Sequence, residues 1–262
     1  MIEAALEPAP ALAQAVAAAG AQDAASGPRS AAGPLLAVCG LTGGAGASTL
    51  SYLVALERAT HSSSPVLVCD AGGPGAGLAL YAGACSPRSL EEAGERLAAG
   101  RPLCGGLFAE PAPGVRLIAT GPALAPEGSP AGLRGLLTDA REAHALTVID
   151  CGTLARLSAR VALELATHVA WVLPATLGGL SRAGAVLASL EAGQPSGSEI
   201  VVARREQGER KAGLRELSRL AEERQAPLVL MPHIPDLAEE GHTSVLEAAE
   251  LTLAGIATLI RS

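Results

Sequence analysis

A glycine-rich loop is the segment of this 262-residue chain whose residue types could bind an anion. The apolar run Leu35–Cys39 leads into it, and a helical pattern over Ser48–Ala59 follows it. Glycines let the backbone curl so that successive N–H groups face one anion, and a helix N-terminus adds its dipole and unpaired donors. The residues expected to bind phosphate are Gly43, Gly44, Ala45, Gly46, Ala47, Ser48 and Thr49. A tight strand-to-helix turn is the alternative interpretation.

Two aspartates at the ends of apolar runs are the candidates for holding a divalent cation. Asp70 ends the run that begins at Val66, and Asp150 follows Leu146–Ile149. An aspartate that closes a buried strand beside a phosphate loop suits a hard cation, which prefers oxygen ligands. We therefore expect Ser48, Asp70 and Asp150 to hold Mg²⁺. A polar cap at the end of a strand is the alternative role for each aspartate.

Alternating apolar and helical segments position these residues. The expected strands are Leu35–Cys39, Pro65–Cys69, Val115–Ala119, Leu146–Ile149, Val169–Leu173, Glu199–Ala203 and Pro227–Met231. The expected helices are Ser48–Ala59, Ser89–Ala99, Ala131–Ala143, Ala155–Thr167, Ser181–Glu191, Ala212–Arg224 and Ser244–Ile260. Strands that are apolar throughout are covered on both faces, and repeated strand–helix units form parallel sheets. The predicted fold class is α/β, a mainly parallel twisted sheet with helices on both faces and ligands at the carboxyl ends of the strands.

The chain divides into two parts by composition. Residues 1–33 are rich in Ala, Pro, Gly and Ser, which predicts a flexible arm. A helix that docks on a partner is the alternative for this segment. Residues 34–262 are expected to form one domain, because their length is sufficient for a single large core.

The glycine loop resembles the deviant Walker A motif of the MinD/ParA group of P-loop NTPases, Lys-Gly-Gly-x-Gly-Lys-Thr/Ser-Thr. Thr42 and Ala47 stand where that motif has its two lysines. The resemblance implies that a lysine at position 47 would contact the β- and γ-phosphates, and one at position 42 the partner's nucleotide in an ATP-bound dimer. Lys211 is the one lysine among 19 Lys and Arg residues. Drift from lysine to arginine would have kept the charge, so the cation itself has been lost.

Four further segments extend the resemblance over about residues 34–260. Asp70 matches the first aspartate of a family motif, a hydrophobic run followed by Asp-x-Asp, while Gly72 replaces the second, which helps to orient the attacking water. Asp150 resembles the Walker B aspartate that holds Mg²⁺ through water. Ile200–Arg205 takes the place of a strand that ends in Asn-Arg beside the adenine, although the asparagine is absent here. Leu228–Asp236 resembles the segment that precedes the last helix.

Charge and cysteine usage restrict the partners and the compartment. The net charge of −7 and the single Trp and Phe argue against nucleic acid as a partner. A basic stretch is interleaved with glutamates, which predicts a solvated, ion-paired helix, with a DNA- or partner-binding face as the alternative. Its cations are Arg204, Arg205, Arg210, Lys211, Arg215, Arg219 and Arg224. Five widely spaced cysteines without a CxxC predict reduced thiols. With no secretory signal and no long apolar run, we expect a cytoplasmic protein without an integral membrane segment.

The resemblance leads to a functional hypothesis. The chain is expected to be a degenerate MinD/ParA-like nucleotide-binding protein that serves as a localisation or assembly factor, similar to the TadZ/CpaE-like branch found with pilus and secretion machinery. ATP and Mg²⁺ are the expected cofactors, with weak or absent ATP hydrolysis. A protein of that machinery and a second copy of the chain are the expected partners, and a partner is expected to recruit it to the membrane. The alternatives are an active ParA-type ATPase that partitions DNA or other cargo, and an interaction module without nucleotide.

Overall fold

An eight-stranded sheet forms the centre of the computed structural model, which describes residues 32–73, 77–101, 106–120, 127–190, 197–205, 213–233 and 242–261. The strand order is β3-β4-β2-β5-β1-β6-β7-β8, and all neighbouring pairs are parallel except β3 with β4. The strands are β1 Leu35–Gly40, β2 Val66–Asp70, β3 Ala109–Ala112, β4 Val115–Ile118, β5 Leu146–Asp150, β6 His168–Pro174, β7 Ser198–Arg204 and β8 Leu228–Met231. The predicted parallel α/β fold is confirmed.

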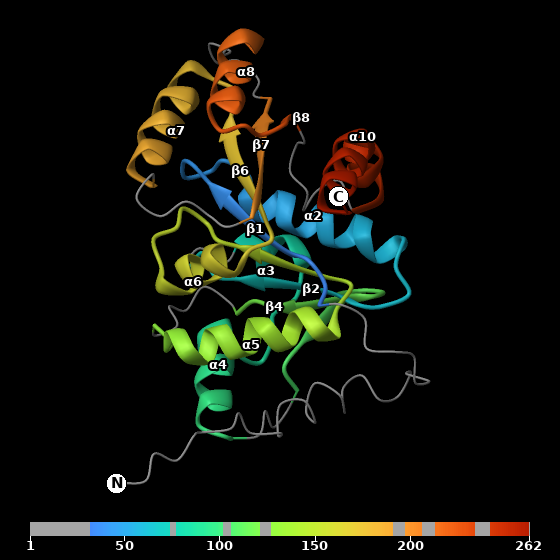
Figure 1. Cartoon of the computed structure of the whole chain (residues 1–262). Helices are drawn as coiled ribbons and strands as arrows, with labels where there is room; N and C mark the ends of the chain where they lie inside the picture. The colour runs from blue at the N-terminus through green and yellow to red at the C-terminus, as the bar shows by residue number, and fades with distance from the viewer. Residues whose placement is uncertain are drawn as a thin grey trace, which may run out of the picture.

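Helices cover both faces of this sheet (Figure 1). They are α2 Ala47–Thr60, α3 Gly77–Ala82, α4 Leu90–Ala98, α5 Pro130–Ala143, α6 Leu157–Leu165, α7 Leu177–Leu190, α8 Leu214–Glu223 and α10 His242–Arg261. Helices α2, α3 and α10 pack on one face, and α4 to α8 pack on the other. Figure 1 shows α10 beside α2, and α4 beside α5 on the opposite side of the sheet.

The central strand β1 shows why the strand segments are apolar at every position. Leu35, Ala37 and Cys39 pack against α4 to α8, while Leu36 and Val38 pack against α2, α3 and α10. All five side chains are fully buried. Because successive side chains of a strand point to opposite faces, a strand covered on both sides needs apolar residues without alternation.

A serine N-cap marks the start of both α4 and α5. Ser89 caps α4 by accepting a hydrogen bond from the Glu92 N–H at 3.1 Å. Ser129 caps α5 in the same way, accepting from the Gly132 N–H at 3.1 Å. The two helices meet through glycine, because a Cβ placed on Gly132 would lie 2.5 Å from the Gly94 carbonyl oxygen. The backbones of α4 and α5 therefore approach each other closely at these two glycines.

The observed elements differ from the expected ones in a few places. The strand β3 and the short helix α3 were not expected, since β3 contains Pro111 and a charged residue and α3 follows a glycine-rich stretch. Helix α7 begins at Leu177 rather than at Ser181. Just before this start, Thr176 Oγ1 accepts a hydrogen bond from the Gly179 N–H at 3.0 Å. Helix α6 is shorter at both ends than expected, because Arg156 and Ala166 have extended backbone.

The predicted arm, residues 1–33, lies outside the described residues except at its end. There the Gly33 N–H donates to the Arg141 carbonyl oxygen at 2.7 Å, and Arg141 Nε donates back to the Gly33 carbonyl oxygen at 2.9 Å. None of the described helices is both long and apolar enough to cross a membrane.

Candidate functional site

The loop between β1 and α2 has the backbone shape of an anion-binding nest. Gly44 and Gly46 have φ angles of 71° and 98°, which favour glycine, while the intervening Ala45 has no positive φ. Such alternation turns successive N–H groups toward one point. Gly46 is the N-cap of α2 and provides no side-chain cap, so the first-turn N–H groups have neither an intrahelical acceptor nor a cap.

Ser48 and Asp150 are in direct contact. The Ser48 hydroxyl donates a hydrogen bond to the Asp150 carboxylate, and the Gly152 N–H donates to Asp150 Oδ1 at 3.0 Å. Asp150 ends β5, which is paired with β1, so the strand pairing brings it beside the loop that follows β1. Burial nevertheless raises the pKa of Asp150 above its ordinary value, although both hydrogen bonds lower it.

Asp70 lies next to Asp150 at the same edge of the sheet. The two residues are paired across β2 and β5, and the Ala71 N–H donates to the Asp150 carbonyl oxygen at 2.8 Å. Burial, followed by the charge of Asp150, raises the pKa of Asp70 to about 7, although the Gly72 N–H donates to Asp70 Oδ1 at 2.9 Å. Two neighbouring buried carboxylates therefore resist ionisation together, and a cation between them would remove that cost.

These three residues fit a magnesium ion bound together with a ligand. Mg²⁺ takes one or two carboxylates and completes its shell with water and phosphate oxygens. In the described part of the chain no group of three or more His, Cys, Asp or Glu side chains could hold a metal. The two carboxylates and the hydroxyl of Ser48, Asp70 and Asp150 are ligands of the kind that Mg²⁺ takes when water and phosphate complete its shell.

The position of the missing second aspartate is blocked by backbone. A Cβ on Gly72 would lie 3.0 Å from both the Cα and the N of Gly152. Conversely, a Cβ on Gly152 would lie 2.8 Å from the Gly72 Cα, and Gly152 has a φ of 51°. The two loops that follow β2 and β5 therefore touch through glycine. A side chain at position 72 would push them apart.

The two positions where the resembling motif has lysine are buried. Thr42 is 8% exposed and Ala47 is 7% exposed. Thr42 Oγ1 is buried and finds no hydrogen-bond partner among the described residues. A buried hydroxyl without a partner is costly, so the loop contains a polar group that a ligand could satisfy.

An arginine from another strand lies over the glycine loop. Arg204 ends β7, and its Nη2 donates to the Gly44 carbonyl oxygen at 2.9 Å. A Cβ on Gly46 would lie 3.2 Å from Arg204 Cδ and 3.3 Å from its Nη1. Since β6 separates β1 from β7, this side chain reaches past the end of β6. Sequence analysis placed Arg204 in the strand beside a base, not against the loop. The available signal was an arginine at the carboxyl end of a strand.

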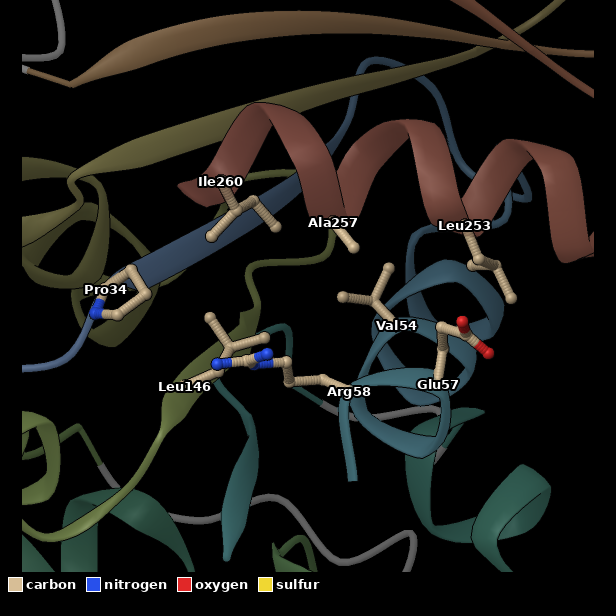
Figure 2. A pocket seen from close by; sticks show the side chains of 8 residues that line it. All are labelled: Pro34, Val54, Glu57, Arg58, Leu146, Leu253, Ala257 and Ile260. Atoms are coloured by element: carbon tan, nitrogen blue, oxygen red, sulfur yellow. The ribbon is translucent and has the colours of Figure 1, made fainter. Parts of the chain in front are cut away.

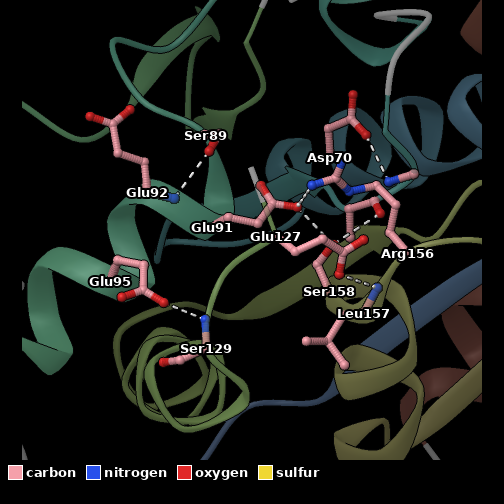
Figure 3. Close-up of polar contacts among 12 residues, drawn as sticks. Asp70, Ser89, Glu91, Glu92, Glu95, Glu127, Ser129, Arg156, Leu157 and Ser158 are labelled. Carbon is pink, nitrogen blue, oxygen red and sulfur yellow. Dashed lines mark hydrogen bonds and ion pairs between the residues drawn. The ribbon is translucent and has the colours of Figure 1, made fainter. Parts of the chain in front are cut away.

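A buried ion pair borders the site on its other side (Figure 3). Arg156 Nη2 lies 3.1 Å from Glu91 Oε1, and these side chains are 8% and 5% exposed. The Ser158 hydroxyl donates to the same Glu91 oxygen at 2.8 Å. The stem of Arg156 covers Gly73, where a Cβ would lie 2.7 Å from its Cδ. Sequence analysis did not single out this pair, which joins α4 to the loop after β5.

A hollow between α2 and α10 lies away from the glycine loop (Figure 2). Pro34 and Leu146 line it, and they stand at the amino ends of β1 and β5. Val54, Glu57, Arg58, Leu253, Ala257 and Ile260 complete the lining. The phosphate loop follows the carboxyl end of β1, so the hollow belongs to the opposite edge of the sheet.

Two minor predictions fall partly within the described residues. Among the described residues, Cys39, Cys69 and Cys151 are free and buried, and Cys85 is free and exposed; the reduced state of the thiols stays a prediction. Within the basic stretch, Arg219 pairs with Glu223 at 3.4 Å on the exposed side of α8. Arg224 Nε donates to Glu199 Oε2 at 2.8 Å in a mostly buried contact. Residues 206–212 of the stretch lie outside the described residues.

Comparisons with known proteins agree with this geometry at the level of fold. No protein-family model matches the chain, and no curated protein sequence matches it either. A ParA family ATPase from Chlorobium tepidum superimposes with a TM-score of 0.67 and 18% identity, covering 87% of this chain and 98% of that one. MinD in the MinC:MinD complex from Aquifex aeolicus gives a TM-score of 0.67 and 15% identity, covering 87% and 96%.

A third structure is similar and carries a ligand. MinD from Pyrococcus horikoshii, in complex with Mg-ADP, gives a TM-score of 0.65 and 17% identity, covering 86% of this chain and 96% of that one. The likeness extends over nearly the whole of both chains. The described fold is therefore that of the MinD/ParA-type P-loop NTPases.

Proposed function

We propose that this protein binds ATP and Mg²⁺ at residues 43–49, hydrolyses the nucleotide weakly or not at all, and acts as a localisation or assembly factor. The observation that carries the proposal is that one site has the groups for binding and lacks a group for hydrolysis. The loop, Ser48 and the two aspartates are the residue types that bind a metal-chelated phosphate. Where the resembling motif has a second aspartate that orients the attacking water, this chain has Gly72, which is in close backbone contact with Gly152.

The binding half of the proposal rests on donors and acceptors. The N–H groups around Gly44 and Gly46 would donate hydrogen bonds to phosphate oxygens, and the Ser48 hydroxyl would share the cation with Asp70 and Asp150. When bound, Mg²⁺ supplies positive charge that neutralises phosphate and carboxylate oxygens. Without it, burial opposes ionisation of both aspartates, and the charge of Asp150 further opposes ionisation of Asp70.

The weak-hydrolysis half rests on the absent carboxylate and cations. Phosphoryl transfer depends almost entirely on positioning and electrostatic stabilisation, so each lost charge reduces the rate directly. Losing a charge-assisted phosphate contact costs about 1.5–3 kcal/mol of binding, roughly tenfold to a hundredfold in affinity. Ala47 lacks one such cation and Thr42 another, and Gly72 carries no carboxylate.

A nucleotide that is bound but not hydrolysed serves as a structural ligand. We infer that it fixes the conformation of the glycine loop so that a protein partner can bind there. A protein of the pilus or secretion machinery is one candidate partner, and a second copy of the chain is another. The similar MinD structure in complex with MinC supports a protein partner as the class. We place the protein in the cytoplasm, with recruitment to the membrane through its partner.

Calorimetric titration with ATP, with Mg²⁺ and with EDTA, tests the proposal. We expect Mg²⁺-dependent binding weaker than about 10 μM and phosphate release far below about 1 per second. Ser48→Ala should reduce the Mg²⁺ dependence, whereas Ser63→Ala, at an exposed position in the loop after α2, serves as a matched control. Turnover near 1 per second would favour the active ATPase. No binding up to about 1 mM would favour the interaction module.

A further inference from the structure

We propose that Arg204 provides the phosphate-binding cation that the glycine loop lacks, so that the charge comes from the end of β7 instead of from α2. This inference rests on the proposed function, because it names the group that binds the phosphates at that site. It concerns a residue that the motif itself does not contain.

The guanidinium is already docked on the loop. Arg204 Nη2 donates to the Gly44 carbonyl oxygen at 2.9 Å, at an exposed contact, and Nη1 faces Gly46. A guanidinium presents five N–H donors in a planar fork, and this geometry matches the oxygens of a phosphate group. The charge therefore stands at the edge of the nest where the N–H groups converge.

The backbone of the loop leaves room for this side chain. Gly46 has a φ of 98°, and a Cβ there would approach the Arg204 side chain to 3.2 Å. Glycine is thus needed at position 46 for its conformation and for the close approach of the arginine. A lysine at the adjacent position 47 would add a second cation beside the same glycine, whereas Ala47 adds none.

Arg156, the arginine on the opposite side of the site, forms a buried ion pair with Glu91. Its guanidinium lies 3.1 Å from Glu91 and the side chain is 8% exposed. Extracting it would leave Glu91 buried without its counter-charge, which is costly. Of the two arginines that flank the site in the described residues, Arg204 is the one at an exposed contact with the loop.

Titrations with Mg·ATP and with inorganic tripolyphosphate test the assignment in the full-length protein. Arg204→Ala should weaken binding of both ligands by about tenfold to a hundredfold, the range of a charge-assisted contact. Arg204→Lys should recover part of the loss, because it restores the charge without the planar fork. Arg219→Ala is the control for net charge, since it removes the same charge from an exposed side chain on α8, where Arg219 pairs with Glu223, and it should change affinity less than about threefold.

A charge-relocation variant separates ligand contact from structural support. Arg204→Ala combined with Ala47→Lys moves the cation to α2 and should restore much of the affinity lost by Arg204→Ala alone. Raising the salt concentration should weaken the wild type more than Arg204→Ala, because the variant has lost the screened contact. A merely structural arginine would produce neither result.

The outcomes distinguish this inference from the proposed function. If the wild type binds neither ligand, both are wrong. If the wild type binds Mg·ATP and Arg204→Ala binds it equally well, the nucleotide site stands and the assignment of Arg204 is wrong. Arg204→Ala could also bind more tightly than the wild type while melting within a few degrees of it. That result would show that the arginine blocks the nucleotide site, and it would overturn the assignment.

Discussion

Replacing Gly72 with aspartate restores the carboxylate of the resembling motif at a position where the structure offers it no room. The new Cβ would lie 3.0 Å from two backbone atoms of Gly152. Gly152 cannot yield easily, because its φ of 51° and its own contact with Gly72 tie the two loops together. We therefore expect Gly72→Asp to destabilise the fold and to leave ATP turnover at its wild-type level.

The magnitude has a steric and an electrostatic part. Inserting a side chain into a close contact costs about 1–3 kcal/mol. A third carboxylate beside Asp70 and Asp150 adds about 1 kcal/mol of repulsion at a partly exposed position. The sum is roughly 2–4 kcal/mol, and a domain of this size loses about 2–4 °C of Tm for each kcal/mol. The expected decrease in Tm is therefore about 4–16 °C.

Thermal unfolding followed by circular dichroism measures this effect, and Gly72→Ala isolates its steric part. The alanine variant should lose less Tm than the aspartate variant. The difference between them should shrink when Mg²⁺ is added, because a cation offsets the repulsion among the carboxylates. A Gly72→Asp protein that melts within about 1 °C of the wild type, or hydrolyses ATP near 1 per second, would refute the argument.

Two further predictions concern buried charge elsewhere in the fold. Burial lowers the pKa of His144 to about 4, below the 6.5 of an unfolded chain. Folding stability is therefore complete above about pH 6.5 and decreases as the pH falls toward 4, by about 2 kcal/mol between pH 7.5 and 5. In urea titrations His144→Gln should show a smaller loss over that interval, and an equal loss would contradict the assignment. Glu91→Leu should lower the free energy of unfolding by about 3–5 kcal/mol, because it leaves the buried Arg156 guanidinium without its counter-charge. The double variant with Arg156→Met should cost less than the single one, and additive losses in the double-mutant cycle would count against a coupled pair.

Most of the regular elements could be predicted from local sequence. Runs that are apolar at every position predicted β1, β2, β5, β6 and β7, because burial on both faces leaves a signal within a few residues. Serines before α4 and glycines before α2 marked where helices begin. The element β3 could not be predicted, since it contains Pro111 and forms only as an edge strand paired with β4.

The predicted nucleotide and metal residues are a prediction of a different kind. The structure brings Ser48, Asp70 and Asp150 together, as the rule for the carboxyl ends of parallel strands implies. Their proximity follows from topology, whereas the ligands they hold remain a prediction. The losses at Thr42 and Ala47 were visible in the sequence because the motif is contiguous.

The sequence by itself determined the parallel α/β class, the position of the glycine loop and the absence of its lysines. These properties depend on neighbouring residues, and hydrophobic periodicity or a short motif records them directly. Only the tertiary structure decided that Arg204 lies on Gly44, because that contact depends on the order of β1, β6 and β7 across the sheet. It also decided that Gly72 touches Gly152, so that the packing of the two loops leaves no room for a carboxylate side chain at position 72. Strand order and loop contacts join residues far apart in the chain, and no local pattern encodes them.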